Sequence, residues 1–211
     1  MIIFTAVLLA FGSVFDFAFG ANGFNSNSTL FVLDALFSLV FPVSVLVYFF
    51  AYKRYSVRDV VSQLGLIPSR RTPVHILIGV GIFLLMLAIE IATAAISNFT
   101  NVQINTNVST MLNSAPMWFL IFSAVIVPLN EEILFRGFLV PRIGIFFSAV
   151  VFGLGHYAYN STFGIEIIAA FIFGLIAGYA FKRTKSLYPS LIAHILVNAT
   201  TLAALTLLVV R

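Results

Sequence analysis

The sequence predicts an all-α polytopic membrane protein, a bundle of about seven transmembrane helices. Of its 211 residues, 61% are hydrophobic and 9% are charged, and the mean hydropathy is +1.11. A soluble domain of this size cannot bury so much apolar surface. The apolar runs are continuous over about 20 residues, which favours helices over the alternating strands of a membrane barrel. Helices also satisfy their own backbone hydrogen bonds, as the lipid interior requires.

Seven apolar segments are predicted to be membrane-embedded helices, bounded by polar turns or by proline. They cover residues 2–19, 30–52, 74–97, 116–140, 144–157, 164–181 and 188–210. The first segment lacks the basic start and the small-residue cleavage site of a signal peptide, so we expect a retained helix. Between the second and third segments, Ser56 as N-cap predicts a short interfacial helix over 56–66.

Lys and Arg gather in the loops that follow the second, fourth and sixth segments, and the loops after the first, third and fifth contain none. By the positive-inside rule, this pattern predicts an N-terminus inside and a C-terminus outside. We expect a multi-pass protein of a prokaryotic plasma membrane. The net charge of +4 reflects this topology, so nucleic acid is not expected as a partner. Cysteine is absent, which excludes a thiolate nucleophile.

Two adjacent carboxylates and an arginine interrupt the apolar segment 116–140. A charge in hydrocarbon costs about 2.5–3.5 kcal/mol on insertion scales, so these residues need partners. Glu132 and Arg136 are four residues apart and are predicted to form a structural ion pair on one helix face. Glu131 projects about 100° away from Glu132, which leaves its carboxylate available for proton transfer. The alternative is that all three form a solvated helix end.

Two histidines and an asparagine lie in later apolar segments. His156 alone could simply face lipid headgroups, and His194 with Asn198, on one helix face, could simply hold helices together. With Glu131 they are the parts of a hydrolytic site. Glu131 and His156 could polarise a water as general base or hold a metal that does so. His194 and Asn198 could donate hydrogen bonds to an oxyanion.

Three motifs in order, Glu-Glu-x-x-x-Arg, Phe152-x-x-x-His156 and His-x-x-x-Asn, resemble the signature of the CPBP intramembrane proteases. That family includes the type II CAAX prenyl endopeptidases and the Abi, or bacteriocin-processing, proteins. The resemblance spans about 125–200, and the first 110 residues share only a basic loop with Leu64-Gly65-Leu66. We therefore expect one integral membrane domain over 1–211. Its N-terminal helices and basic inner loop fill 1–114, and a CPBP-like catalytic core fills 115–211.

The resemblance implies a helical bundle with an intramembrane catalytic cavity open toward the cytosolic side. It implies an endopeptidase that cuts a membrane-associated protein or peptide, which CAAX-type members take in prenylated form. Glu131 and His156 would activate the water, His194 and Asn198 would stabilise the oxyanion, and the Glu-Arg pair would be structural.

The sequence does not decide whether the protein uses a metal cofactor. The family names speak of metalloproteases, and two histidines with a glutamate can bind zinc. The candidate ligands are Glu131, His156 and His194. A glutamate-activated water would perform the same hydrolysis without a metal, so the hydrolase could be glutamate-dependent or metal-dependent.

Two other functions compete with the protease. Buried Glu and His side chains also build proton relays in transporters, and Glu90 and Glu166 would extend such a path. The clustering of the polar residues in three segments favours a site over a path. A non-enzymatic immunity or binding protein on the same scaffold would have no chemical need for the set Glu131, His156, His194 and Asn198.

Overall fold

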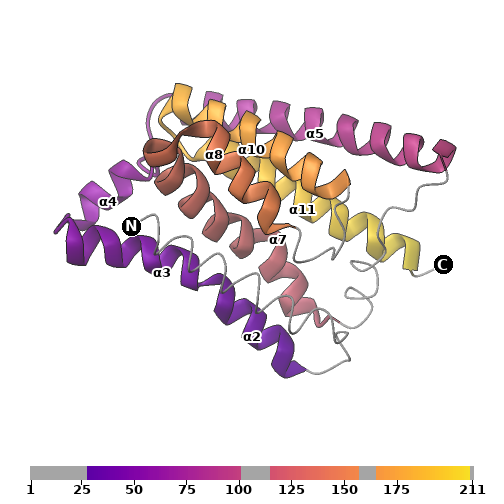
Figure 1. Cartoon of the computed structure of the whole chain (residues 1–211), viewed down its shortest axis with the longest axis horizontal. Helices are drawn as coiled ribbons and strands as arrows, with labels where there is room; N and C mark the ends of the chain where they lie inside the picture. Colours follow the sequence, from indigo (N-terminus) through magenta and orange to yellow (C-terminus); the bar gives the residue numbers. More distant parts are fainter. Residues whose placement is uncertain (1–27, 101–114, 157–164, 210–211) are drawn as a thin grey trace.

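The computed structural model describes residues 28–100, 115–156 and 165–209. Within these ranges the chain forms helices joined by short turns and contains no strand, which confirms the all-α prediction (Figure 1). Four described helices are long and apolar enough to cross a membrane. The predicted helix 2–19 lies outside the described residues, so the total of seven remains a prediction.

The predicted segment 30–52 forms one apolar run of three helical pieces, α2 (Ser28–Ser38), α3 (Val40–Val47) and the π-helix η1 (Tyr48–Tyr52). Pro42 has no N–H, and its ring collides with the carbonyl four residues earlier, so the regular helix breaks between α2 and α3. The buried Ser38 at this break accepts a hydrogen bond of 3.2 Å from Asn130 Nδ2. This bond connects the N-terminal run to the helix that carries the glutamates.

The short helix predicted after this run is present as α4 (Val57–Gln63), which confirms the prediction. The Ser56 side chain accepts from the Asp59 N–H, and the Asp59 carboxylate accepts from Ser56, which completes a capping box. The hydrogen bond from the Ser56 side chain holds the pKa of Asp59 below its ordinary value. After α4 the chain enters α5 (Thr72–Thr100), and Thr72–Thr93 within it is long and apolar enough to cross a membrane.

A single apolar run, Met117–Gly155, contains α7 (Met117–Glu132), the π-helix η2 (Ile133–Leu139) and α8 (Val140–Gly155). An unbroken helix of its 39 residues would measure about 58 Å, roughly twice the thickness of the lipid interior. The run breaks at Gly144, whose φ of +83° and ψ of 169° suit glycine alone. The chain reverses there (Figure 1), so the predicted segments 116–140 and 144–157 are two arms of one bend.

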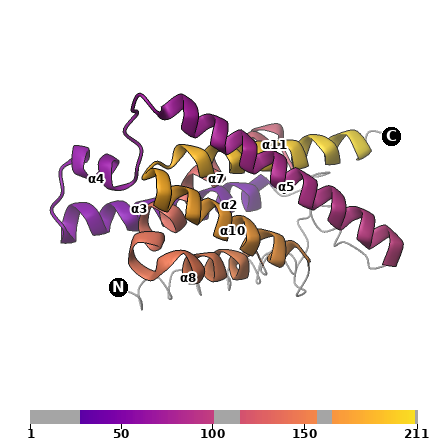
Figure 2. The ribbon, with the colours of Figure 1, turned by 90° about the horizontal axis from the view of Figure 1, so that it is seen from above.

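The last two helices are α10 (Ile165–Thr184) and α11 (Tyr188–Val209). α10 packs on α8, where a Cβ on Gly174 would lie 2.9 Å from Ala149 Cα, so only small residues allow this approach. α11 contacts α5, α7 and α10 and lies among them in the view from above (Figure 2). Its position brings His194 to the end of α7.

Large apolar side chains cover the outside of the described helices. Leu77, Ile121 and Phe147 are 68%, 60% and 62% exposed, on α5, α7 and α8. Such exposure is typical of surfaces that face lipid. The chain is an integral membrane protein, as its sequence predicts.

Candidate active site

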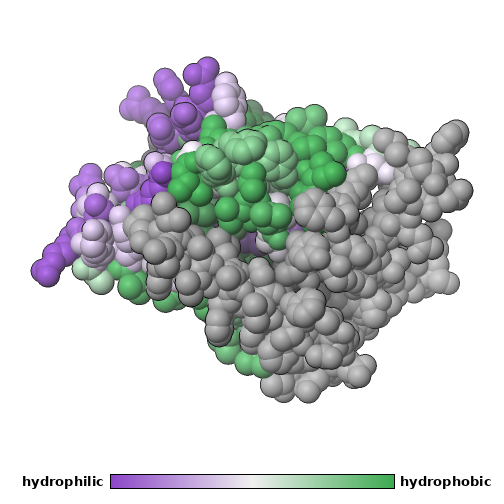
Figure 3. Space-filling model, viewed as in Figure 1, coloured by the Kyte–Doolittle hydropathy of each residue, from purple (hydrophilic) through white to green (hydrophobic). Residues whose placement is uncertain are grey.

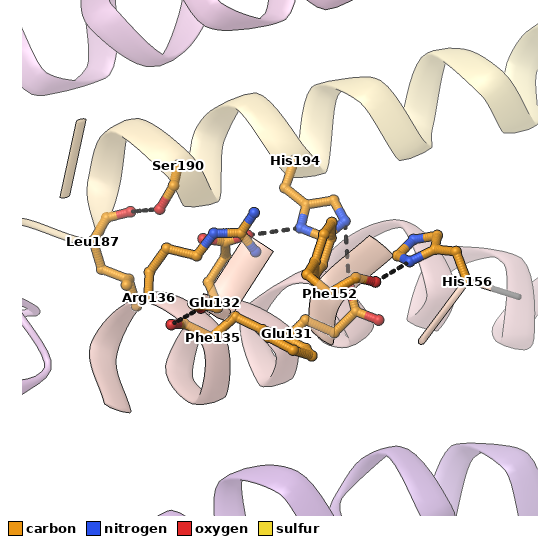
Figure 4. A network of polar contacts seen from close by, with 10 residues as sticks. Glu131, Glu132, Phe135, Arg136, Phe152, His156, Leu187, Ser190 and His194 are labelled. Atoms are coloured by element: carbon orange, nitrogen blue, oxygen red, sulfur yellow. Dashed lines mark hydrogen bonds and ion pairs between the residues drawn. The ribbon is translucent and has the colours of Figure 1, made fainter. Parts of the chain in front are cut away.

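Glu132 lies at the centre of a buried polar network at the junction of α7 and η2 (Figure 4). Its side chain is fully buried, and Oε1 lies 2.8 Å from Arg136 Nη1, the partner that the i,i+4 spacing predicts. The same oxygen lies 2.9 Å from His194 Nδ1 on α11. The sequence predicted the ion pair but not this second bond, because no spacing rule links residues of distant helices.

Arg136 is a buried cation that contacts two aromatic rings. Its guanidinium carbon lies 4.2 Å from the centre of the Phe152 ring and 4.9 Å from that of Phe173. Desolvated cation–π contacts of this kind stabilise a charge that water cannot reach. Phe152 is the phenylalanine of the Phe-x-x-x-His motif. This motif residue is therefore one of the two aromatic contacts of the buried arginine.

The segment that carries Arg136 is a π-helix, η2, rather than the regular helix predicted for 116–140. π-helical turns are rare and occur frequently at functional sites. The buried Ser148 donates from Oγ to the Phe135 carbonyl over 2.9 Å, which satisfies one backbone acceptor of this irregular turn. Pro128, inside α7, removes a further helical N–H just upstream. The sequence contains Pro128, but no known pattern places the π-turn.

Glu131 approaches the other side of the same imidazole. Its Oε2 lies 3.4 Å from His194 Nε2, and its side chain is 14% exposed, against 0% for Glu132. Adjacent glutamates therefore face the two nitrogens of one ring. The expectation that the two side chains project in different directions agrees with this geometry, but the sequence assigned His194 to neither glutamate.

His156 forms the C-terminal cap of α8 and is partly exposed. Its Nδ1 lies 2.9 Å from the Phe152 carbonyl oxygen, so Nδ1 carries the proton that this bond needs. The Phe152 ring lies between the histidines, with centroid distances of 4.7 Å to His156 and 5.8 Å to His194.

Asn198 lies one turn beyond His194 on α11. Its Nδ2 donates to the Ser123 carbonyl over 3.1 Å, which ties α11 to α7.

A further carboxylate, Glu90, lies half-buried on α5, and no hydrogen bond or ion pair among the described residues links it to the network. The side chain of Glu166, the other residue considered for a relay, lies outside the described residues.

Two of the three predicted zinc ligands lie close to each other. Glu131 and His194 are separated by 3.4 Å, close to the roughly 3.3 Å between two ligands of one tetrahedral zinc ion. Among the described residues, however, no group of three His, Cys, Asp or Glu side chains could hold a metal ion. A catalytic zinc ion takes three protein ligands. The described donor set therefore does not complete a zinc site, and no step below depends on a metal.

The fold and the network define a helical integral membrane protein with a buried Glu, His and Arg cluster in its C-terminal half. Residues 113–200 match the family model of type II CAAX prenyl endopeptidases described as Rce1-like. The matched range contains every residue of the network, and it confirms the resemblance that the three motifs predicted.

A second comparison finds a relative that matches part of the chain. The chain is 30% identical over 80 residues to an uncharacterized protein of Bacillus subtilis, YpbD. The alignment covers 38% of this chain and 42% of that protein, so the chain spans less than half the length of this relative. No solved structure matches the chain.

Proposed function

We propose that the protein is an intramembrane endopeptidase that hydrolyses a peptide bond of a membrane-associated protein or peptide. The observation that carries this proposal is the imidazole of His194 held between Glu131 and Glu132. A carboxylate beside an oriented histidine, in a site screened from bulk water, is an arrangement suited to acid–base hydrolysis. The match to the Rce1-like endopeptidase family supports it.

We propose that both ring nitrogens of His194 carry a proton during the reaction, because a carboxylate faces each of them. In this proposal the ring donates from Nδ1 to Glu132, and the carbonyl oxygen of the substrate replaces the Glu131 carboxylate as the acceptor of Nε2–H. His194 would then stabilise the oxyanion.

Glu131 is the proposed general base. As a water attacks the peptide carbonyl carbon, its proton passes to the Glu131 carboxylate, and negative charge develops on the carbonyl oxygen. The carboxylic acid then returns the proton to the amine nitrogen as the C–N bond breaks. We assign to His156 the second hydrogen of the water, because the tautomer with its proton on Nδ1 can accept at Nε2.

Asn198 is the proposed second donor to the oxyanion. An amide group has two N–H donors, and the bond to the Ser123 carbonyl uses one of them. That bond would also fix the direction of the amide group. Glu132, itself held by Arg136, would keep His194 oriented, and neither residue would contact the substrate.

We further propose that the loops containing Lys and Arg, which follow segments 30–52, 116–140 and 164–181, face the cytosol of a prokaryote. The N-terminus would lie inside, and the cleaved bond would lie near that face. Recognition of a prenyl group is a separate part of the proposal. Paired reporter peptides with and without a farnesyl group would test it, since a CAAX-type enzyme would cleave the farnesylated peptide faster.

The central experiment measures cleavage of membrane-tethered reporter peptides by the purified protein in nanodiscs. Glu131→Gln should lower the rate by about 10²-fold or more, the usual contribution of a general base. Glu90→Gln is the matched control, because it removes a membrane carboxylate that lies apart from the network, and it should leave the rate within about twofold. Full cleavage by Glu131→Gln would overturn the proposal.

A further inference from the structure

Most basic residues of the chain lie at one end of the molecule. Of the 11 Lys and Arg residues, five lie in 53–71 and three in 182–185. All eight are exposed, and none forms a salt bridge among the described residues. They are Lys53, Arg54, Arg58, Arg70, Arg71, Lys182, Arg183 and Lys185, together called the basic surface. The one acidic residue in these segments, Asp59, is engaged with Ser56 in the capping box.

The two segments of the basic surface are joined by hydrogen bonds. The Leu187 N–H donates to the Gly65 carbonyl over 2.9 Å, and Tyr188 Oη donates to the Leu66 carbonyl over 3.0 Å. These bonds hold the turn between α10 and α11 against the segment that follows α4. Figure 3 shows hydrophilic residues gathered at this end, beside apolar residues of the described helices.

Two of these cations occupy a backbone conformation that favours glycine. Arg54 has a φ of 54° and Lys185 a φ of 55°, and they are the non-glycine residues with positive φ within the described ranges. Each follows the end of a helix, where glycine is the usual residue. A cation near a helix C-terminus also stabilises the helix dipole, which is one reason to retain it. The side chains around Arg54 and Lys185 give a second reason why a cation lies at each of these positions.

Large apolar side chains lie exposed beside the cations. Tyr52 is 73% exposed next to Lys53, Val57 is 68% exposed next to Arg58, and Val74 is 54% exposed shortly after Arg71. A surface that binds nucleic acid or an acidic protein through charge has no need of such side chains. Cations interleaved with exposed apolar and aromatic side chains are typical of the membrane interface, where chains enter lipid and charges meet headgroups.

We propose that the basic surface binds the headgroups of anionic phospholipids in the leaflet that surrounds it. Each Lys or Arg near an anionic membrane surface strengthens such binding about fivefold. Arg54 and Lys185 would therefore be retained in place of glycine because their charges contact headgroups. This inference concerns lipid binding and holds whether or not the protein hydrolyses peptides.

The test compares lipid retention by the full chain. Protein in nanodiscs of equal phosphatidylglycerol and phosphatidylcholine is released for native mass spectrometry, and the ratio of retained lipids is counted. The wild type should retain phosphatidylglycerol selectively. In the double variant Arg54→Gly, Lys185→Gly, the ratio of retained phosphatidylglycerol to phosphatidylcholine should fall about 25-fold, because two positive charges are removed. It should remain folded, because glycine suits both positions.

The matched control exchanges the cations, Arg54→Lys with Lys185→Arg, and should keep the preference within about twofold. If the glycine variant fails to fold, Lys182→Gln with Arg183→Gln removes two exposed charges from the end of α10 and should show the same loss. An unchanged lipid ratio in the charge-removing variants would overturn the proposal. So would displacement of the lipid by glycerol 3-phosphate, which would indicate a site for free anions, or by polyglutamate, which would indicate an acidic protein partner.

Discussion

His194 Nδ1 lies 2.9 Å from Glu132 Oε1, which joins residues 62 positions apart in the chain. The bond connects the end of α7 to α11, and the ion pair from Arg136 ends on the same oxygen. One carboxylate atom therefore holds both the buried arginine and the histidine of the proposed reaction. The structural and the chemical parts of the site form a single unit.

The adjacent glutamates should differ in what their removal changes. Glu132→Gln leaves Arg136 buried without its counter-ion, which costs about 3–5 kcal/mol and lowers Tm by about 10 °C in a chain of this length. Glu131→Gln removes a partly exposed carboxylate and should leave Tm almost unchanged while it abolishes cleavage. Thermal unfolding of both variants in the same detergent measures the difference. Equal losses of Tm would contradict the separate roles.

Arg136→Lys should not act as a conservative change. Lysine keeps the charge but loses the planar guanidinium that contacts the rings of Phe152 and Phe173, and we expect a loss of about 1–2 kcal/mol with slower cleavage. Arg142→Lys is the matched control. Its guanidinium also lies over an aromatic ring, 3.9 Å from the centre of Phe138, but at a partly exposed position outside the network. Arg142→Lys should leave cleavage unchanged, and an equal kinetic defect in both variants would argue against the assigned role of Arg136.

The contact between Gly137 and Leu64 predicts a compensating pair of substitutions. A Cβ on Gly137, in η2, would lie 2.7 Å from Leu64 Cδ2, and Leu64 is 2% exposed. Gly137→Ala should cost about 1–3 kcal/mol through overpacking, and Leu64→Ala about 2–5 kcal/mol through a cavity. The double variant should lose at least about 1 kcal/mol less than their sum, because the new methyl group enters the space that Leu64 leaves.

The control for this pair is Gly81→Ala on α5, where no atom lies within 4 Å of the added Cβ. It should be neutral or slightly stabilising, since alanine favours helix. Unfolding free energies measured for all four variants give the coupling directly. Strict additivity of Gly137→Ala and Leu64→Ala would mean that α4 and η2 do not share this contact.

Cleavage should survive removal of metal ions. His194 faces Glu132 and Glu131 with its two nitrogens, and the described residues form no group of three ligands. Exhaustive treatment with a chelator should leave the rate within about twofold, and added zinc should not raise it. Metal analysis of the same sample gives the zinc content. Loss of activity that zinc restores would replace the glutamate-dependent mechanism with a metal-dependent one.

The sequence was sufficient for the class of protein and for one ion pair of the candidate site. Apolar runs of membrane-spanning length are a local property, and so is the i,i+4 spacing of Glu132 and Arg136, so both could be predicted without coordinates. The capping box that begins α4 was predictable for the same reason. The order of the three motifs then sufficed to indicate the family whose model matches residues 113–200.

The tertiary structure determined which of these residues contact one another. The bond between Glu132 and His194, the aromatic faces around Arg136 and the π-turn of η2 all depend on helix packing. Helix packing depends on which side chains fit across an interface, and spacing within one helix does not encode that. The sequence by itself therefore determined a membrane-embedded set of Glu, His and Arg residues. Only the packing of α11 against α7 determined that one imidazole lies between two adjacent carboxylates.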